Sequence, residues 1–346
     1  MATTIWYSNP TSGNAMNFTD SNQWNTATDG SGTAGNPDST DDKAVIQAGD
    51  TVTLDANVTT GGCSNLGTLT GNTSFSLTLA GNDQDNNYNN AGTVTNLNLI
   101  MTGIRASGDR TVVDVGSGIR DFTLNDTTNS GNNVHALGNN LSISGDLTIT
   151  SGTLDTSFLG TDRNLTVTGA LDVGSSGALT CNSSAVQCNG LRTTGGTVNL
   201  PDASGSFTVK GTEFSGYGIY DRAGSGNIVH NSGTVTWDTG GTSTMYALST
   251  FNNITTTTSG TTLRWFSALT LAGTLTVAAN TTVHEHSSAG GAFTVNGDVS
   301  VSGTLGDSDA YSAYSFGSLT IASGGTYNAT SGTTTITSET SGGYAI

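Results

Sequence analysis

The chain has 346 residues and a formal net charge of −17, and glycine occurs 48 times. Glu occurs only three times and Lys only twice, so two strong helix formers are nearly missing, and we predict an all-β fold with almost no helix. A chain this acidic, without a basic stripe, would repel a phosphate backbone, which excludes nucleic acid as a partner. No apolar run of about 18 residues is present, so we predict no membrane insertion.

The opening 43 residues differ in composition from the rest of the chain. They hold two of the four Trp residues, Trp6 and Trp24, and two of the three Pro residues, and they show no apolar alternation. We predict that residues 1–43 form an N-terminal cap or attachment region, because the bare end of a stacked β-structure would expose unpaired strand edges.

From residue 44 onward the dominant feature is a repeat with the pattern apolar-x-apolar-x-Gly-x-apolar-x-apolar. Clear copies are LSISGDLTIT (141–150), LTVTGALDVG (165–174), and the segments 269–277 and 293–301, with a shorter echo at Leu319 and Ile321. Strict alternation predicts strands with one buried face. A unit of about 19–26 residues cannot bury that face alone, but copies stacked on one another form a continuous core.

We therefore predict that residues 44–346 form a right-handed, single-stranded parallel β-helix, or β-solenoid, with roughly a dozen coils. An array of antiparallel sandwich domains is the alternative, but the period of the repeat is too short for it. The repeated glycines, Gly145 and Gly169 among them, share the parity of the apolar residues. We expect them to point inward at tight corners, where a Cβ has little room.

The three cysteines, Cys63, Cys181 and Cys188, form no disulfide framework, because an odd number fits a disulfide-stapled domain poorly. Cys181 and Cys188 could pair only if their Cα atoms lay within about 7 Å of each other. We predict buried, reduced thiols.

The segments NFTDSNQWNT, GDTVTLDANVTTGG and GSLTIASGGTYNATSGTTTITS resemble the β-solenoid surface proteins of bacteriophage particles, such as tail fibres and capsid fibres. They are also similar to the passenger repeats of bacterial adhesins and autotransporters. The resemblance covers nearly the whole chain, and it is one of composition. The start, MATTIWYSNPTSG, lacks the charged and apolar regions of a secretory signal, which favours the phage alternative.

The resemblance implies a structural virion protein, a rigid fibre or capsid-decorating rod that mediates attachment to the host surface. It would be made in the host cytoplasm and carried on the virion surface. The implied partners are other virion proteins, a host cell-surface glycan, and further copies of the chain in a homo-oligomer such as a trimer. The chain departs from many tail fibres because it shows no triple-stranded coiled coil.

Two alternatives to this function remain open, a bacterial surface adhesin and a polysaccharide lyase or hydrolase of the tailspike kind. Glycoside hydrolysis needs two carboxylates at a fixed separation. Asp146 and Asp172 occupy matching positions of adjacent repeats, but Asp is the main charged residue of the chain, and solvated turn Asp is the simpler interpretation. We predict that the protein is not an enzyme and has no catalytic residue.

Two segments offer candidate metal ligands. TTVHEHSS (281–288) places His284 and His286 on one face of a strand, with Glu285 opposite, and two imidazoles at that spacing suit a transition metal. GNDQDNNYNN (81–90) contains Asp83 and Asp85, whose oxygens are the ligands that Ca²⁺ takes, although the closing Glu of an EF-hand is missing. Solvent-facing His and a polar turn are the simpler interpretations. We therefore predict no cofactor, with Ca²⁺ as the alternative.

We expect two polar, irregular loops, 81–92 and 306–317, to project from the corners and to carry any binding residues. Their aromatic side chains are Tyr88, Tyr311 and Tyr314. Trp237 and Trp265, together with Tyr220, are candidates for a platform on which sugar rings stack. The alternative is that these rings are buried or pack beneath loops.

Overall fold

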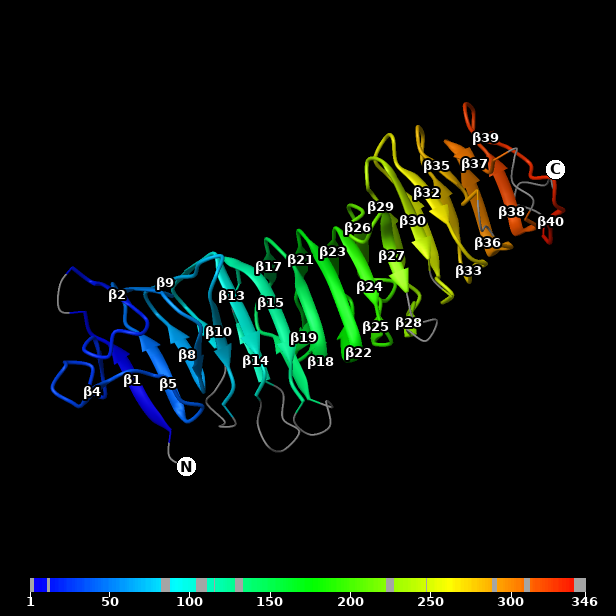
Figure 1. Ribbon diagram of the computed structural model, residues 1–346. Coiled ribbons are helices and arrows are strands. Elements are labelled where there is room, and N and C mark those ends of the chain that lie inside the picture. Colours follow the sequence, from blue (N-terminus) through cyan, green and yellow to red (C-terminus); the bar gives the residue numbers. More distant parts are fainter. Residues whose placement is uncertain are drawn as a thin grey trace. The chain divides into compact units, whose positions relative to one another are not determined.

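The computed structural model is an all-β protein whose mostly parallel strands stack as a β-solenoid of about 12 turns, with no helix among the residues described (Figure 1). This architecture confirms the solenoid predicted from the repeat and excludes the array of sandwich domains. The described residues are 3–10, 13–81, 88–103, 111–114, 116–127, 133–221, 227–246, 248–287, 291–307 and 312–338.

The chain divides into two compact units. The first comprises Met1–Thr168 together with Ser176–Leu179, and the second comprises Gly169–Ser175 together with Thr180–Ile346. The long strand β22 (Ala170–Thr180) contributes residues to both. Each unit has its own walls of parallel strands and its own buried stacks of side chains.

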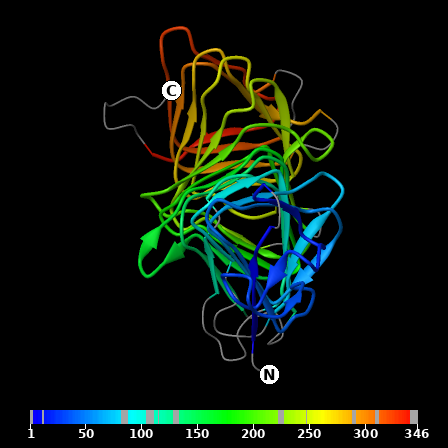
Figure 2. The same cartoon turned by 90° about the vertical axis from the view of Figure 1, so that its left-hand side faces the viewer.

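Walls of parallel strands surround the interior of the first unit (Figure 2). The first wall comprises β1 (Thr4–Ser8), β5 (Asp42–Ile46), β8 (Gly62–Asn65), β11 (Tyr88–Asn90), β14 (Thr111–Asp114), β16 (Val134–Leu137) and the end of β18 (Leu147–Asp155). The second comprises β2 (Ala15–Asn17), β6 (Thr51–Thr53), β9 (Thr68–Thr70) and β12 (Thr93–Thr95), and farther along the chain β17 (Leu141–Ile143) pairs with β21 (Leu165–Val167). The third comprises β7 (Val58–Thr60), β10 (Ser76–Leu79), β13 (Leu97–Met101), β15 (Ile119–Asn125) and the start of β18.

Strand pairing begins within residues 1–43. β1 and β2 run parallel to β5 and β6, so they already belong to the walls. Two antiparallel strands follow, β3 (Trp24–Asn25) and β4 (Ala34–Gly35), and β3 also pairs with β1. Trp24 is fully buried, and its indole NH donates a hydrogen bond of 2.8 Å to the Phe18 carbonyl. A second antiparallel hairpin, β19 (Ser157–Phe158) with β20 (Thr161–Asp162), lies outside the walls.

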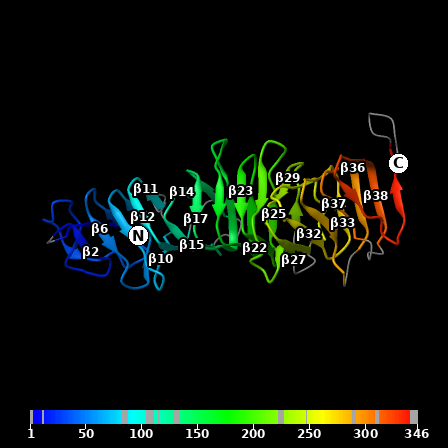
Figure 3. The ribbon, with the colours of Figure 1, turned by 90° about the horizontal axis from the view of Figure 1, so that it is seen from above.

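The strands of the second unit also run side by side in rows (Figure 3). The row that we call the ladder wall comprises β24 (Gly190–Thr193), β27 (Tyr217–Asp221), β30 (Thr242–Tyr246), β32 (Thr262–Trp265), β35 (Thr282–Glu285), β37 (Thr304–Leu305) and β39 (Thr326–Tyr327). Another row comprises β23 (Ala185–Cys188), β26 (Ser206–Val209), β29 (Thr234–Trp237), β31 (Asn253–Thr256), β34 (Leu275–Val277), β36 (Phe293–Val301) and β38 (Tyr314–Ile321). Among the described residues of this unit, four strands remain. β25 (Thr197–Asn199) pairs with β28 (Asn227–Val229), and β33 (Leu269–Leu271) pairs with β36. β40 (Thr334–Ile336) pairs with β38.

The apolar positions of the repeat form continuous buried stacks. In the first unit, register pairs join Val58, Leu77, Leu99, Phe122 and Leu147 in successive coils, and all five are at most 6% exposed. The repeat copies also pair as the spacing predicts, because Leu141 lies opposite Leu165 and Leu269 lies opposite Phe293. In the final echo Leu319 is buried, whereas Ile321 pairs with the buried Val301 but is itself 36% exposed, so the expected burial is wrong for Ile321.

The repeated glycines do lie between walls, but they do not point into the core as we expected. Gly145 and Gly273 are only half-buried. A Cβ at Gly145 would overlap the side chain of Asp121 from the preceding coil, and one at Gly273 would overlap Asn253. Each of these side chains accepts a hydrogen bond from the amide that follows the glycine, at 3.0 Å for Asp121 and 2.8 Å for Asn253. The glycine is therefore needed for close stacking of coils.

All three cysteines are buried and free, as predicted. Burial raises the pKa of the Cys63 and Cys188 thiols to about 12, so neither forms a thiolate near neutral pH. A search of the described residues for a helix long and apolar enough to cross a membrane finds none.

Candidate functional site

A row of outward-facing aromatic side chains crosses the ladder wall. In four successive coils an inward residue at or near the end of the strand is followed at once by an outward ring, in the pairs Ile219–Tyr220, Met245–Tyr246, Trp265–Phe266 and Glu285–His286. The inward members are buried, and the outward members are half-buried. Strand alternation and parallel register therefore place one ring directly over the next.

The rings make contact with one another. The ring centroids of Tyr220 and Tyr246 are 5.7 Å apart, those of Tyr246 and Phe266 are 5.3 Å apart, and those of Phe266 and His286 are 5.1 Å apart. Tyr217 stacks on Tyr220 with centroids 4.6 Å apart and planes 26° apart. We call these five residues the aromatic ladder. Its other planes meet at 52–64°, so some ring faces and edges point to solvent.

A tight turn holds one end of the aromatic ladder. Phe214 and Tyr217 form an antiparallel bridge, and the amide of Tyr217 donates to the Phe214 carbonyl at 3.0 Å. The two residues between them, Ser215 and Gly216, both have a left-handed backbone, with φ of 54° and 93°. A left-handed serine is uncommon, and such conformations cluster at functional positions.

The turn forms one side of an open pocket of about 360 Å³, which we call the ladder pocket. Arg192 also lines it, and its guanidinium carbon lies 4.8 Å from the centroid of the Phe214 ring. Arg192 also donates two hydrogen bonds to Asp172, one of them at 3.0 Å from Nε, and these raise its pKa, so it stays charged. The lining residues are Arg192, Glu213, Phe214, Ser215, Tyr217 and Tyr220.

The far end of the aromatic ladder is basic. His284 and His286 share the outer face of β35, as predicted, and Glu285 between them is buried. Arg264 pairs in register with His284. Burial lowers the pKa of both histidines, and the charge of Arg264 lowers it further; for His284, Asp307 opposes this shift.

Among the described residues, the two histidines are not joined by further side chains that would complete a metal site. The carboxylate of Asp307 lies beside His284, with 3.7 Å between Nδ1 and Oδ2. Within the part of the chain that the structure describes, no cluster of three or more His, Cys, Asp or Glu side chains could hold a metal ion. The candidate Ca²⁺ ligands Asp83 and Asp85 lie outside the described residues.

The two tryptophans considered for a sugar platform are buried, which confirms the simpler interpretation of them and removes both from the candidate platform. Trp237 is 0% exposed and donates a hydrogen bond of 2.5 Å to Ser243, and Trp265 is 1% exposed and donates one of 3.1 Å to the Gly291 carbonyl. Each is an inward member of its strand, and a side chain on that parity faces the interior. Tyr220, the third member of the proposed platform, is on the outer face and belongs to the aromatic ladder.

Two of the tyrosines expected on projecting loops are also buried. Tyr88 is 0% exposed and starts β11, where it pairs with Cys63 in the inward column. Tyr314 is 1% exposed and starts β38, where its ring packs near those of Phe293 and Phe316. They are strand residues and not loop residues, so they cannot contact a ligand at the surface. Tyr311 lies outside the described residues.

The carboxylates considered for catalysis have other roles. Asp172 is the ion-pair partner of Arg192, and its side chain is 20% exposed. Asp146 is exposed, and its amide donates a hydrogen bond to Asp121. A carboxylate tied to an arginine is poorly suited to act as a general acid, which needs a raised pKa.

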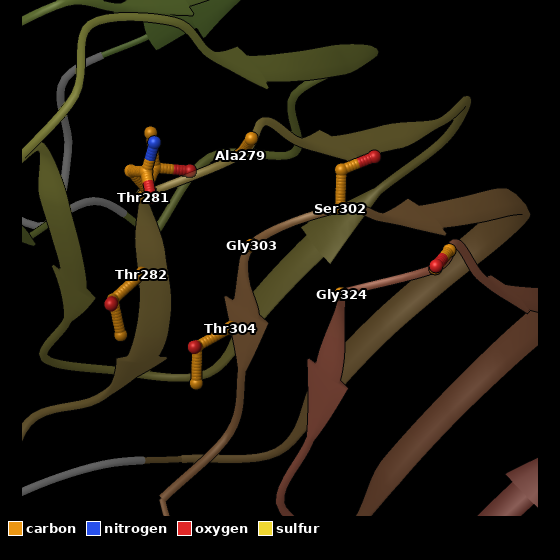
Figure 4. A pocket seen from close by; sticks show the side chains of 9 residues that line it. Ala279, Thr281, Thr282, Ser302, Gly303, Thr304 and Gly324 are labelled. Carbon is orange, nitrogen blue, oxygen red and sulfur yellow. The ribbon is translucent and has the colours of Figure 1, made fainter.

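A second pocket, of about 440 Å³, lies at a corner formed by three successive coils (Figure 4). Thr282 and Thr304 lie next to each other on the paired strands β35 and β37. Hydroxyl and backbone groups line it, together with Asn280, and none of the lining side chains is titratable. This pocket offers hydrogen-bonding groups but no charged or aromatic side chain, so the ladder pocket is the stronger candidate site.

Comparisons of the chain with protein-family models, with curated proteins and with solved structures find no match.

Proposed function

We propose that the protein is a structural, non-enzymatic component of the surface of a bacteriophage particle, a fibre or capsid-decorating protein that contacts the host. The observation that carries the proposal is the parallel stacking of coil on coil within each unit, with one exposed aromatic row across the ladder wall. The compositional resemblance to phage solenoid proteins is the reason for proposing a phage particle as its location.

Stiffness follows from how each coil is held. Backbone hydrogen bonds join neighbouring strands of a row from coil to coil, and buried stacks run through the interior, such as the column from Val186 through Phe207 and Val235 to Ile254. Bending a unit would break both at once. A stiff support that presents the same side chains on many copies makes weak individual contacts strong through multivalency.

The proposed partners are other virion proteins for anchoring, further copies of the chain in a homo-oligomer, and a host cell-surface glycan as the target. A bacterial surface adhesin would use the same architecture, so the location of the protein separates the two functions.

The test is quantitative mass spectrometry of purified virus particles against washed, uninfected cells from the same culture. The proposal expects recovery with the particles in constant ratio to the major capsid protein, and the copy number separates a few fibres from a capsid-wide coat. Recovery from uninfected cell surfaces alone would overturn the proposal in favour of an adhesin.

A further inference from the structure

The fold does not require the rings of the aromatic ladder to lie on its outer face. The interior of the second unit already contains Trp237, Trp265, Phe293, Tyr314 and Phe316, all at most 1% exposed. Outward positions of β32 and β35 are otherwise polar, with Thr262 and Arg264 on the first strand and Thr282 and His284 on the second. Half-buried rings in contiguous coils form an apolar patch of the kind that marks an interaction site.

The spacing of the rings suits a repetitive ligand that lies across the coils. Ring centroids in successive coils are 5.1–5.7 Å apart, slightly more than the strand spacing of about 4.8 Å. A pyranose unit has a comparable length, and its C–H face packs on aromatic rings while its hydroxyl groups remain at the edge. Each sugar of a chain could therefore meet one coil.

The ladder pocket supplies the polar contacts that such a ligand needs. The guanidinium of Arg192 and the carboxylate of Glu213 offer charged donors and acceptors, which form stronger hydrogen bonds to hydroxyl groups than neutral side chains do. The pocket volume of about 360 Å³ lies at the low end of the range of small-molecule sites. It could hold the terminal unit or units of an oligosaccharide.

The charges around the ladder pocket and the aromatic ladder favour uncharged over anionic saccharides. The positive charge of Arg192 is paired with Asp172, Glu213 adds a negative charge in the pocket, Arg264 adds one positive charge at the far end, and the chain as a whole carries −17. The burial-lowered pKa values of His284 and His286 leave both imidazoles neutral at pH 7. An anionic polysaccharide would meet net repulsion, whereas an uncharged one would not.

We propose that the ladder pocket and the aromatic ladder together bind an uncharged oligosaccharide of pyranose units, with its end in the pocket and its chain crossing the coils from Tyr220 toward Phe266. The inference rests on the proposed function only for its biological role, as the contact with the host surface. Binding by the purified chain can be measured without a particle.

The experiment is calorimetric titration of the full chain with di- and hexasaccharides of glucose, mannose, galactose and N-acetylglucosamine, and with oligogalacturonate as the anionic comparison. The variants are Tyr220→Ser, in the pocket, and Tyr246→Ser, one coil beyond it. Phe158→Ser is the matched control, because Phe158 is also a half-buried ring, on the β19–β20 hairpin of the first unit.

We expect at least one uncharged hexasaccharide to bind at millimolar concentration or below, and both tyrosine variants to weaken it by about tenfold or more. For the disaccharide only Tyr220→Ser should matter, since a short ligand does not reach Tyr246. Phe158→Ser should change neither, and the melting temperatures should stay within a few degrees of the parent.

The proposal is overturned if no uncharged saccharide binds, if oligogalacturonate binds more tightly, or if both tyrosine variants lower the melting temperature while binding is unchanged. The last result would make the aromatic ladder a device for stacking coils. Binding by a protein that is absent from particles would keep the site and remove the virion role. Presence on particles without saccharide binding would keep the virion role and remove the binding site.

Discussion

Replacing Leu147 with alanine should lower the free energy of unfolding by about 3–4 kcal/mol. Leu147 is 0% exposed and lies opposite Phe122 of the preceding coil in a buried stack. The substitution removes about three methylene equivalents, which at ~0.8 kcal/mol each amounts to about 2.4 kcal/mol of lost burial. A cavity is left as well, because the backbone ladders on both sides prevent the coils from collapsing into it, and buried Leu-to-Ala changes cost about 2–5 kcal/mol in total.

The assay is urea unfolding followed by far-ultraviolet circular dichroism, with Thr150→Val as the matched control. Thr150 is an exposed residue of the same strand, and valine keeps its shape and its β-branching, so its effect should stay within about 0.5 kcal/mol. In thermal unfolding, Leu147→Ala should lower the melting temperature by roughly 6–16 °C for a unit of this size. Equal effects of the two substitutions, or a loss below about 1 kcal/mol for Leu147→Ala, would refute the register and the buried stack.

Three further predictions concern the coil corners, the thiols and the histidines. Gly273→Ala should cost about 1–3 kcal/mol in the same urea assay, because the added Cβ overlaps the asparagine of the preceding coil, and a variant of parental stability would contradict that packing. In the native protein Cys63 and Cys188 should resist a thiol-specific disulfide reagent until urea unfolds the chain, since burial raises the pKa of each to about 12; rapid labelling of the folded protein would count against this. The pKa values of His284 and His286, measured by NMR titration, should lie below the usual 6.5. The unfolded state then binds protons more readily, so stability should fall as pH drops through about 6.5, and replacing both with glutamine should flatten that dependence; midpoints at or above 6.5 would show the burial argument to be wrong.

Alternation and repeat spacing were enough to predict the class of fold and much of the register. Leu141 and Leu165 pair because the repeats that contain them differ by one coil, and both are buried because parity fixes the face of a strand. Parity could not explain the glycines. Gly145 is required by Asp121 of the preceding coil, and that contact depends on a register across coils of unequal length.

The candidate site was harder to predict because the larger rings, the tryptophans, were chosen as candidates, and they are the buried members of their strands. Trp265 and Phe266 are adjacent, and only strand parity decides that the tryptophan is buried and the phenylalanine is outside. A usable signal was present, since two of the four pairs of the aromatic ladder place a tyrosine directly after an apolar residue, at the end of β30 and one residue before the end of β27. Recognising it required the alignment of coils 20 to 28 residues apart, which the register of Arg192 with Tyr220 and of Arg264 with His284 provides.

The central claim is that the protein lies on the outer surface of a virus particle with its aromatic ladder accessible. Immunogold electron microscopy of intact purified particles tests it directly, with antibodies raised against the turn at residues 212–218 and, as a comparison, against strand β36, whose alternate side chains are buried and whose backbone is paired on both sides. The account predicts labelling of intact particles by the first antibody and labelling by the second only after denaturation. Unlabelled particles, with both antibodies binding only after the particles are disrupted, would contradict it.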